Sequence, residues 1–499
     1  MGFNIFEDQA ACDTKVSEVK RVAIVGAGVA GLQTARFLSE KGFMCCIFEK
    51  AKDVGGVWRE NYADFGLQVP KELYEFPGFE YPKDEDFDLF PSGPQVQRYI
   101  QKYAERFNLK EMIKFGTSAV ALSPREGGGW HVKYENGGLI ESTDFDFCVM
   151  STGMYSSHPN LPKAPGMEAF QGEILHSCTF KDKEQVRDKR VIVVGGGKSA
   201  VDNAVAAAKV GASSTLLYRD AHWPVARYLL NLIPFKWGTY SRFGHFMLPA
   251  SHTVGGFATW FHAVFVPLKW IFWRIVEMMF CVQFNLKGDA VPDTPIEIDL
   301  FTGGQILNYD YRDMLRKGEV TGIKGSIESF TENGVVLVDG TMIEADVVIY
   351  GTGFRKNYDL FDEATRNKLA VERDGLYLFR NIISPGVADL AFIGSEVSTF
   401  NNILTHGLQA LWLQKMLTGE MQLPKKTEMQ RIVEKEQAWK RSWMPPSSAR
   451  ASIWQLHMMT YHDNLCKDMR ARHKRKGYNF VAELLAPYSA ADYESLFQS

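Results

Sequence analysis

Two glycine-rich turns are the features of this sequence whose residue types and spacing most directly predict chemistry. In the first turn, Gly26, Gly28 and Gly31 follow the apolar run VAIV with G-x-G-x-x-G spacing. The first glycine permits a tight turn, the second lets a pyrophosphate approach the backbone, and the third lets a helix pack closely on a strand. Because the amides at the start of a helix attract anions, this turn is predicted to bind a dinucleotide.

An acidic residue follows the first turn at the distance expected for a contact to a ribose. Glu49 ends the next apolar run, about 20 residues after the glycines. Lys50 comes directly after it, and Gly56, Val57 and Trp58 lie a short way further along the chain. We expect these residues to contact the same dinucleotide. The alternative is that the adjacent Gly55 and Gly56 form an ordinary turn.

The second turn has the spacing G-x-G-x-x-A and follows the apolar run VIVV. Its defining residues are Gly195, Gly197 and Ala200. Lys198 and Ser199 stand at the start of the predicted helix, where contacts to phosphate are favoured. This pattern predicts a second dinucleotide site in the same chain.

The residue that ends the strand after the second turn indicates which dinucleotide binds there. The run TLLY leads into Arg219, at the place where the first unit has Glu49. A guanidinium can hold a 2′-phosphate with two parallel hydrogen bonds and leaves no carboxylate to repel it. The sequence therefore favours NADPH over NADH, with a solvated surface arginine as the alternative. Two dinucleotides predict a bound flavin and a nicotinamide cofactor that delivers hydride to it.

The elements that must position these residues form two strand–turn–helix–strand units. One unit begins at Arg21 and the other at Arg190. Because such units build parallel sheets, we predict an α/β fold with two Rossmann-like dinucleotide-binding domains. Residues 113–150 alternate between apolar and polar types and predict a β-meander, and helical patterns dominate from residue 404 onward.

Composition argues against several other classes of function. The chain has 499 residues and a net charge of −3, from 56 Lys and Arg against 59 Asp and Glu, so it has no field that favours nucleic acid. Seven cysteines without Cys-x-x-Cys spacing argue against a disulfide scaffold, a cysteine-rich zinc site and a dithiol redox motif. The N-terminal run MGFNIFEDQAACDTK lacks an apolar signal region. A cytoplasmic protein is therefore expected.

One apolar segment leaves contact with a membrane open. Residues 243–268 contain no Asp, Glu, Lys or Arg, and residues 269–284 have a regular pattern with a wide apolar face. Three interpretations remain, namely a buried or cavity-lining subdomain, a helix in the membrane interface, and a membrane span. A contact through 243–284 would make the protein peripheral to a membrane such as the endoplasmic reticulum. A homodimer also remains open.

Further motifs resemble one known family. The run FQGEILHSCTF places Phe170, Gly172, His176 and Phe180 at F-x-G-x-x-x-H-x-x-x-[YFW] spacing. This resembles the fingerprint of class B flavoprotein monooxygenases, and it lies between the two glycine-rich turns as in the flavin-containing monooxygenase family. Two apolar runs that end in Thr-Gly, DFDFCVMSTGM and ADVVIYGTGF, resemble the paired linkers between the domains of that family. The C-terminal run YHDNLCKDMR is similar to the plant-type branch.

The resemblance implies how the chain is divided into domains. An FAD domain would be built from residues 1–165 and 346–445, with an NADPH domain at 166–345 inserted between them. The apolar insertion at about 230–300 would belong to the NADPH domain, and 446–499 would form a helical tail.

The resemblance also implies roles for single residues. Thr352 and Gly353 of the second linker and Gln409 of the run LQALW would contact the cofactor, and His176 would order the linker. The run LQVPKEL places Gln68 where the animal enzymes have an asparagine that faces the flavin. We therefore expect Gln68 to contact FAD and to act in catalysis, with a loop amide of no special role as the alternative.

The reaction that the resemblance implies needs FAD, NADPH and O₂ but no metal. NADPH reduces FAD, O₂ adds to flavin carbon C4a to form a hydroperoxyflavin, and a soft nucleophile takes the distal oxygen. A small-molecule amine is the favoured substrate, by N-hydroxylation or N-oxide formation, and pipecolate-like or alkaloid amines fit the plant branch. Sulfide oxygenation and Baeyer–Villiger oxidation of a ketone are the alternatives, the latter disfavoured because Phe180 stands where Baeyer–Villiger enzymes have tryptophan. A flavin disulfide reductase and a non-enzymatic flavoprotein are less favoured.

Overall fold

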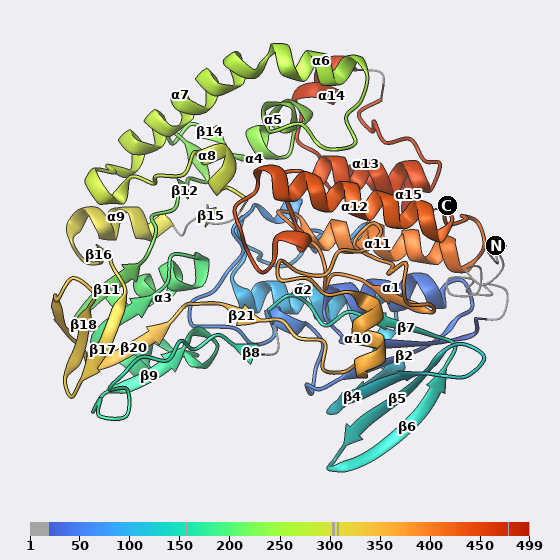
Figure 1. Cartoon of the computed structure of the whole chain (residues 1–499), viewed down its shortest axis with the longest axis horizontal. Helices are drawn as coiled ribbons and strands as arrows, with labels where there is room; N and C mark the ends of the chain where they lie inside the picture. Colours follow the sequence, from blue (N-terminus) through green and yellow to red (C-terminus); the bar gives the residue numbers. More distant parts are fainter. Residues whose placement is uncertain (1–18, 156–157, 302–304, 307–308, 478, 499) are drawn as a thin grey trace, which may run out of the picture.

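A five-stranded parallel sheet carries the first glycine-rich turn (Figure 1). The computed structural model describes residues 19–155, 158–301, 305–306, 309–477 and 479–498. The strand order is β22-β7-β1-β2-β3, with β22 (Leu390–Phe392), β7 (Phe147–Met150), β1 (Arg21–Val25), β2 (Met44–Glu49) and β3 (Ile113–Phe115). Its central strands are buried on both faces, which explains why they are continuous apolar runs in the sequence.

A second five-stranded parallel sheet carries the second turn. The strand order is β16-β11-β10-β20-β9, with β16 (Thr321–Lys324), β11 (Ser213–Tyr218), β10 (Arg190–Val194), β20 (Val347–Tyr350) and β9 (Glu173–His176). Strand β20 lies beyond the domain boundary expected at residue 345, yet it pairs with β10 through Val193 opposite Ile349. The residues of β20 therefore belong to the second sheet, whereas the expected boundary places them in the domain of the first sheet.

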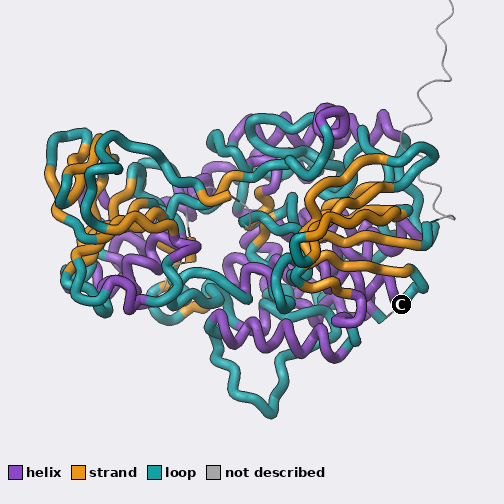
Figure 2. Tube along the Cα trace, turned by 90° about the horizontal axis from the view of Figure 1, so that it is seen from below, coloured by secondary structure: helices purple, strands orange, loops and turns teal. Residues whose placement is uncertain are grey.

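The chain leaves the first sheet and later returns to it. After β7 it builds the second sheet, and β22 then pairs with β7 in parallel. The two crossing segments meet where β8 (His158–Pro159) pairs antiparallel with β21 (Phe354–Arg355). Figure 2 shows the strands gathered into two groups at opposite sides of the molecule. This topology confirms the predicted α/β class with two parallel sheets.

Alternate residues of the first sheet face two different layers. Val22 and Ile24 pack in a core shared with helices α1 (Val29–Ser39) and α11 (Asn402–Leu417). Ala23 and Val25 pack in a second core against an antiparallel sheet. That sheet is the predicted meander, with β4 (Thr117–Pro124), β5 (Trp130–Asn136) and β6 (Leu139–Phe145), whereas β3 and β7 at its ends pair in the parallel sheet. The period of two along a strand dictates this division.

The second sheet is sandwiched in the same way. Val193 packs with helix α3 (Lys198–Ala208), and Ile192 packs with a small antiparallel sheet on the other face. That small sheet consists of β17 (Ile327–Thr331), β18 (Gly334–Leu337) and β19 (Met342–Glu344). The remaining helices of the two sheet regions and the tail are α2 (Gly93–Arg106), α9 (Tyr309–Lys317), α10 (Glu363–Leu369), α12 (Lys426–Trp443), α13 (Met458–Asp468), α14 (Phe480–Leu485) and α15 (Glu494–Phe497).

Most of the chain between β11 and α9 forms the apolar insertion, whose helices α5, α6 and α7 lie at the top of Figure 1. Its helices are α4 (Lys236–Thr239), α5 (Arg242–Met247), α6 (Phe257–Val264), α7 (Val266–Phe284) and α8 (Ile296–Asp299), and its short strand pairs are β12 (Pro224–Val225) with β15 (Gln305–Ile306) and β13 (Tyr228–Leu229) with β14 (Ile233–Pro234). Among the described residues, no helix combines the length and apolar character that crossing a bilayer requires. The membrane-span interpretation is therefore not supported.

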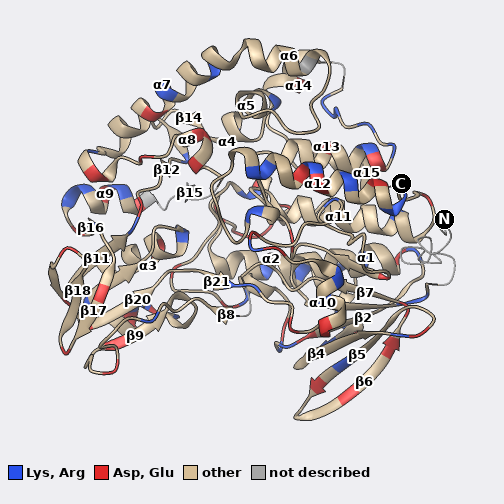
Figure 3. Ribbon diagram, viewed as in Figure 1, with Lys and Arg blue, Asp and Glu red and all other residues tan. Residues whose placement is uncertain are grey.

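Helix α7 turns its charged residues toward the protein. Lys269 is buried and donates to the backbone oxygen of Leu248 at 3.3 Å, and Arg274 bonds the Glu297 carboxylate of α8 at 2.6 Å. Four large apolar side chains on the other side of the helix are exposed, Ile271, Ile275, Met278 and Val282. Figure 3 shows few charges along α6 and α7. The apolar face predicted from the sequence therefore points outward, which argues against a wholly buried subdomain.

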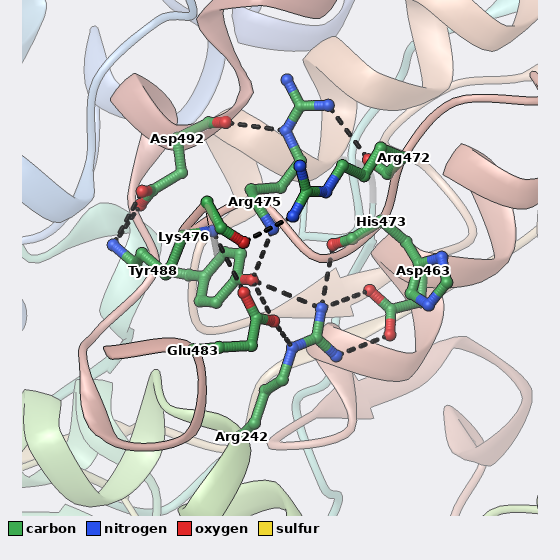
Figure 4. Close-up of polar contacts among 10 residues, drawn as sticks. Arg242, Asp463, Arg472, His473, Arg475, Lys476, Glu483, Tyr488 and Asp492 are labelled. Carbon is green, nitrogen blue, oxygen red and sulfur yellow. Dashed lines mark hydrogen bonds and ion pairs between the residues drawn. The ribbon is translucent and has the colours of Figure 1, made fainter. Parts of the chain in front are cut away.

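A mostly buried arginine joins the insertion to the C-terminal tail (Figure 4). Arg242 of α5 donates to both carboxylate oxygens of Asp463 in α13, at 2.7 and 3.0 Å, and to Glu483 of α14. The Tyr488 hydroxyl donates to the same Glu483 oxygen at 2.5 Å. Because breaking a buried, fully hydrogen-bonded charge pair leaves a charge unpaired, this cluster holds α5 against the tail.

Candidate active site

The first glycine-rich turn depends on backbone contacts that a side chain would block. Gly26 has φ +107°, and a Cβ atom there would lie 2.6 Å from the backbone oxygen of Ser151 in the crossing strand. A Cβ on Gly31 would lie 1.9 Å from the oxygen of Gly26. Gly28 has an ordinary φ of −79° and caps helix α1. Its nearest neighbour would be Gly56 Cα at 3.7 Å, so the turn leaves room beside Gly28.

The expected ribose acid is part of the same turn. Glu49 is buried at the end of β2, and its carboxylate accepts hydrogen bonds from the amides of Ala27 at 2.7 Å and Ala51 at 2.8 Å. It therefore braces the turn, and its oxygens keep lone pairs for a further donor. Lys50 and Val57 beside it are exposed.

Gly55 and Gly56 lie directly against the first glycine-rich turn. Gly55 has φ +122° and its amide donates to Ala27 at 3.0 Å. A Cβ there would clash with Gln97, whose side-chain amide donates to Val54 at 2.8 Å. The Trp58 indole donates to the Tyr74 hydroxyl at 3.0 Å, which anchors the following loop. Gly28 and Gly56 thus lie against each other, with a Cβ on Gly56 3.2 Å from Gly28 Cα, and small residues of this kind let a pyrophosphate approach the backbone.

The second turn repeats this geometry with one substitution. A Cβ on Gly195, which has φ +141°, would lie 2.5 Å from the oxygen of Gly351. A Cβ on Gly351 would lie 2.6 Å from Ala200 Cβ, so the close packing of α3 leaves no room for a side chain before Thr352. Gly197 caps α3 with φ −88°, and nothing lies within 4 Å of where its Cβ would be. A phosphate at the start of α3 would therefore meet open space.

Lys198 is tied to the protein. It forms an ion pair with Asp202 one turn along α3, and the Tyr62 hydroxyl donates to the same carboxylate oxygen at 2.9 Å. Burial and the charge of Asp202 raise the pKa of Tyr62, so the phenol stays protonated as the donor. Ser199 is half-buried beside it. A phosphate contact by Lys198 would have to compete with Asp202.

Arg219 lies where the sequence placed it, directly after β11. Its side chain is exposed, and within the described residues it has no hydrogen bond or ion pair with another side chain. A guanidinium that is not consumed by the protein is available for a phosphate dianion.

The fingerprint histidine contacts the second Thr-Gly linker. His176 Nε2 lies 2.9 Å from the oxygen of Gly353, and burial lowers the pKa of its imidazole. The Thr352 hydroxyl bonds the oxygen of Asn160, whose amide donates to Gly353 at 2.9 Å. These contacts fit the expectation that His176 orders the linker, and Gly353 itself stays open because a Cβ there would meet nothing within 4 Å.

The two glutamines predicted to contact the cofactor differ in their surroundings. Gln68 is half-buried in the loop between Gly66 and Val69, and its side-chain amide has no hydrogen bond within the described part of the chain. Gln409 is fully buried, accepts from the Gly394 amide at 3.0 Å and donates to the Tyr461 hydroxyl at 2.7 Å. In this structure Gln409 supports Gly394 and Tyr461. Its contact to the cofactor stays a prediction.

The sequence did not reveal the residues that connect the region of the first turn with the region of the second turn. The Ala63 amide donates to the oxygen of Phe180 at 2.8 Å, and Lys181 donates to the oxygen of Asn61 at 3.1 Å. Together with the Tyr62–Asp202 bond, they fasten a loop of the first region onto the fingerprint of the second. The spacing of Lys198 and Asp202 was a usable signal for their ion pair, but no pattern connects Tyr62 with a residue 140 positions away.

The fold has two parallel sheets, each with a glycine-rich turn of the dinucleotide-binding type, joined by two paired crossing segments. Comparison with known families gives a match of residues 19–476 to the flavin-binding monooxygenase-like family. The chain belongs to this family. It is an FAD- and NADPH-dependent monooxygenase, and the open space at Gly28 and Gly197 fits these two cofactors.

Relatives with similar sequences come from plants and animals. "Probable flavin-containing monooxygenase 1" of Arabidopsis thaliana is 29% identical over 95% of this chain and 96% of its own length. "Dimethylaniline monooxygenase [N-oxide-forming] 4" of Rattus norvegicus is 27% identical over 91% of this chain and 79% of its own length. The near-complete overlap with the plant protein agrees with the plant-type branch.

Solved structures with the same fold include enzymes of several reactions. The S-allyl-L-cysteine S-oxygenase of Allium sativum has a TM-score of 0.64 at 18% identity and covers 96% of this chain and 99% of its own. A steroid monooxygenase bound to NADP has a TM-score of 0.69 at 18% identity and covers 90% of this chain and 97% of its own. At this level of identity, the likeness establishes the fold.

A matched pair of valine substitutions tests which turn holds which cofactor. Both Gly28 and Gly197 have φ values that valine tolerates, and neither position has a close neighbour. Gly28→Val is expected to give a folded, colourless protein, because the side chains would fill the FAD cradle. Gly197→Val is expected to stay yellow but to need at least about tenfold more NADPH for half-maximal flavin reduction, or about 1.4 kcal/mol.

The measurements are circular dichroism, the flavin-to-protein absorbance ratio and anaerobic titration with NADPH. Loss of flavin in Gly197→Val alone would reverse the assignment of the two sites. Full cofactor binding by both variants would show that neither turn contacts a dinucleotide.

Proposed function

We propose that this enzyme transfers one oxygen atom from O₂ to the nitrogen of a small amine. The observation that carries the proposal is the similarity, over most of the chain, to a relative named as N-oxide-forming. Phe180 supports it, because the side chain is fully buried where Baeyer–Villiger enzymes have tryptophan. N-hydroxylation or N-oxide formation is the proposed outcome, on a pipecolate-like or alkaloid amine.

We assign the sites to the two cofactors as follows. FAD is held by the first turn with Glu49, and NADPH by the second turn with Arg219. Bound FAD and NADPH supply oxygen activation and hydride. The chain contributes binding, orientation and the exclusion of water from the linker region, where His176 stays neutral and Thr352 is fixed. Exclusion of water strengthens each hydrogen bond made there.

The corresponding domain division uses the topology of both sheets. We propose an FAD domain from 1–165 and from 351–445, an NADPH domain at 166–350 that contains the insertion, and a tail at 446–499. The upper boundary of the NADPH domain follows β20.

A substrate comparison with the purified, FAD-loaded enzyme tests the amine proposal. A tertiary aryl amine, an aryl thioether and a cyclic ketone are offered separately with NADPH and air, and products are identified by mass. The amine is expected to gain one oxygen, with one NADPH consumed for each product, and its kcat/KM is expected to be at least about tenfold above that of the other two.

The other results of this comparison are equally informative. A predominant sulfoxide or lactone would overturn the amine proposal and leave the family assignment intact. NADPH consumption that yields only H₂O₂ with all three probes would contradict the amine proposal as well.

We propose that Gln68 holds a hydrogen bond needed for efficient oxygen transfer. It is half-buried, and its amide is not consumed by the described protein groups. Gln68→Leu keeps a side chain of similar volume, although one bond shorter, and removes the amide. We expect this variant to keep its FAD and to release several-fold more H₂O₂ per NADPH, because a preorganised donor is lost.

The variant Gln430→Leu is the matched control, since Gln430 is an exposed residue of α12 that bonds only Glu434. Gln68→Asn should restore part of the coupling between NADPH and product. Wild-type coupling in Gln68→Leu would show that Gln68 is an ordinary loop amide.

We also propose that this is a cytosolic enzyme whose insertion rests on a lipid surface. In α7, Ile271, Ile275, Met278 and Val282 are 48, 47, 60 and 74% exposed at spacings of three and four residues, which form one helix face. In α6, four aromatic and branched residues continue the same pattern, Phe257, Trp260, Phe261 and Val264.

The character of this outer face favours a bilayer interface over water. Exposed tryptophans are typical of a helix that lies in the interface, and Trp260 of α6 is 58% exposed. The charged residues of α7 are held inward by Glu297 and Leu248. The Arg242 cluster fixes the neighbouring α5 to the tail, so the face is presented by a braced part of the fold.

Flotation with phosphatidylcholine vesicles tests the lipid contact. The wild type is expected to float with the vesicles, and Ile271→Glu is expected to reduce the bound fraction at least about fivefold, because a carboxylate in the interface must be desolvated. Ile140→Glu is the control, since Ile140 is 63% exposed in β6 of the meander. Equal flotation of both variants, or none for the wild type, would contradict the proposal.

Light scattering on the same samples tests the other occupant, a second copy of this chain. If the wild type is a dimer and Ile271→Glu is a monomer, this face is a homodimer interface and the lipid proposal is wrong.

A further inference from the structure

A histidine that the sequence analysis did not single out lies over the second turn. His222 follows β11, three residues after Arg219. A Cβ atom on Gly196 would lie 2.9 Å from His222 Cδ2 and 3.4 Å from His222 Nε2. The imidazole therefore packs on the middle of the Gly195–Gly197 turn, the part of the chain that approaches phosphate.

A buried carboxylate orients this imidazole. Asp299 of α8 is 2% exposed, and one of its oxygens lies 2.8 Å from His222 Nδ1 while the other accepts from the Trp223 amide at 2.7 Å. The Asp299 contact assigns the proton to Nδ1, and the other ring nitrogen, Nε2, lies beside Gly196 of the second turn. The His222 side chain is 31% exposed, and its Nε2 has no hydrogen bond within the described residues.

The surroundings of His222 favour the charged imidazolium. Burial alone would lower its pKa, but the hydrogen bond and charge of Asp299 outweigh burial, and Asp220 adds to them, so the pKa is raised. Asp299 and Asp220 are the charged groups that act on the ring. With a raised pKa, His222 carries a positive charge over part of the neutral range.

The other cation at the turn is less available. Lys198 is paired with Asp202 and lies at the base of α3, whereas Arg219 is exposed. A phosphate at this turn would thus meet two basic groups, Arg219 and His222. Within the described residues, the Arg219 guanidinium has no ion pair and His222 Nε2 has no hydrogen bond.

We propose that His222, positioned by Asp299, donates a hydrogen bond from Nε2 to a phosphate of the dinucleotide bound at the second turn. The inference rests on the assignment of this turn to NADPH. The contact would tighten binding while the imidazole is protonated and would weaken it as the pH rises through the pKa of His222. The insertion, through Asp299 of α8, would thereby set the affinity of a site on the second sheet.

Calorimetric titration of the FAD-loaded enzyme with NADP⁺ at pH 6, 7, 8 and 9 tests the proposal without turnover. The 2′-phosphate itself gains charge as the pH rises through about 6, which acts in the opposite direction, so the wild type is compared with His222→Gln at each pH. We expect the ratio of the two dissociation constants to be about tenfold at pH 6 and to approach unity at pH 9. The flavin absorbance of each variant confirms that it is folded.

Two further variants separate positioning from charge. Asp299→Asn keeps a group that can contact Nδ1 but lowers the pKa of His222, so its loss of affinity is expected to begin at a lower pH than in the wild type. Arg219→Gln is expected to weaken NADP⁺ binding at every pH and to keep the pH-dependent difference that His222 causes.

The choice of ligand identifies the phosphate. A His222 effect on NADP⁺ alone assigns the contact to the 2′-phosphate, and an effect on NAD⁺ as well assigns it to the pyrophosphate. Equal dissociation constants for the wild type and His222→Gln at all pH values would overturn the proposal. Absence of NADP⁺ binding by the wild type would instead overturn the assignment of the turn.

Discussion

Close backbone contact at two glycine turns is the constraint on which the rest of the structure depends. Gly26 and Gly195 each bring the end of a central strand against the oxygen of a crossing strand, Ser151 in one sheet and Gly351 in the other. A Cβ at either place would overlap that oxygen, so any larger residue would push the sheet and its helix apart. The same closeness leaves the start of each helix bare, and we propose that the two dinucleotides bind there, at the amides and the positive dipole end of each helix.

The two turns act together because the protein ties them to each other. A loop of the first region, Asn61 to Ala63, contacts the fingerprint near Phe180 and reaches Asp202 in α3. His176 holds the second linker through Gly353, and burial keeps its ring neutral. The Tyr62 and His176 contacts are partly buried, and a partly buried polar group resists the loss of its partner. Hydride and oxygen chemistry require this kind of fixed distance between two cofactors.

The insertion connects the cofactor site with the surface of the molecule. Its short helix α8 supplies Asp299 to the second turn, and its helix α7 turns Ile271 and Val282 outward. Arg242 fastens α5 to the tail through Asp463 and Glu483. The insertion thus links an apolar outer face to the second turn, where we propose that the phosphates of NADPH bind.

The sequence by itself determined the two nucleotide units, because the requirements at Gly26, Gly28, Gly195 and Gly197 are local and depend on neighbours in the chain. It also indicated the linkers, the meander and the amphipathic α7. Only the tertiary structure decided which way the apolar face of α7 points, that β20 belongs to the second sheet, and that Gln409 supports Gly394. It alone brought His222 to Asp299 and Tyr62 to Asp202. Such contacts join residues far apart in the sequence, and local spacing holds no information about which distant side chain completes them.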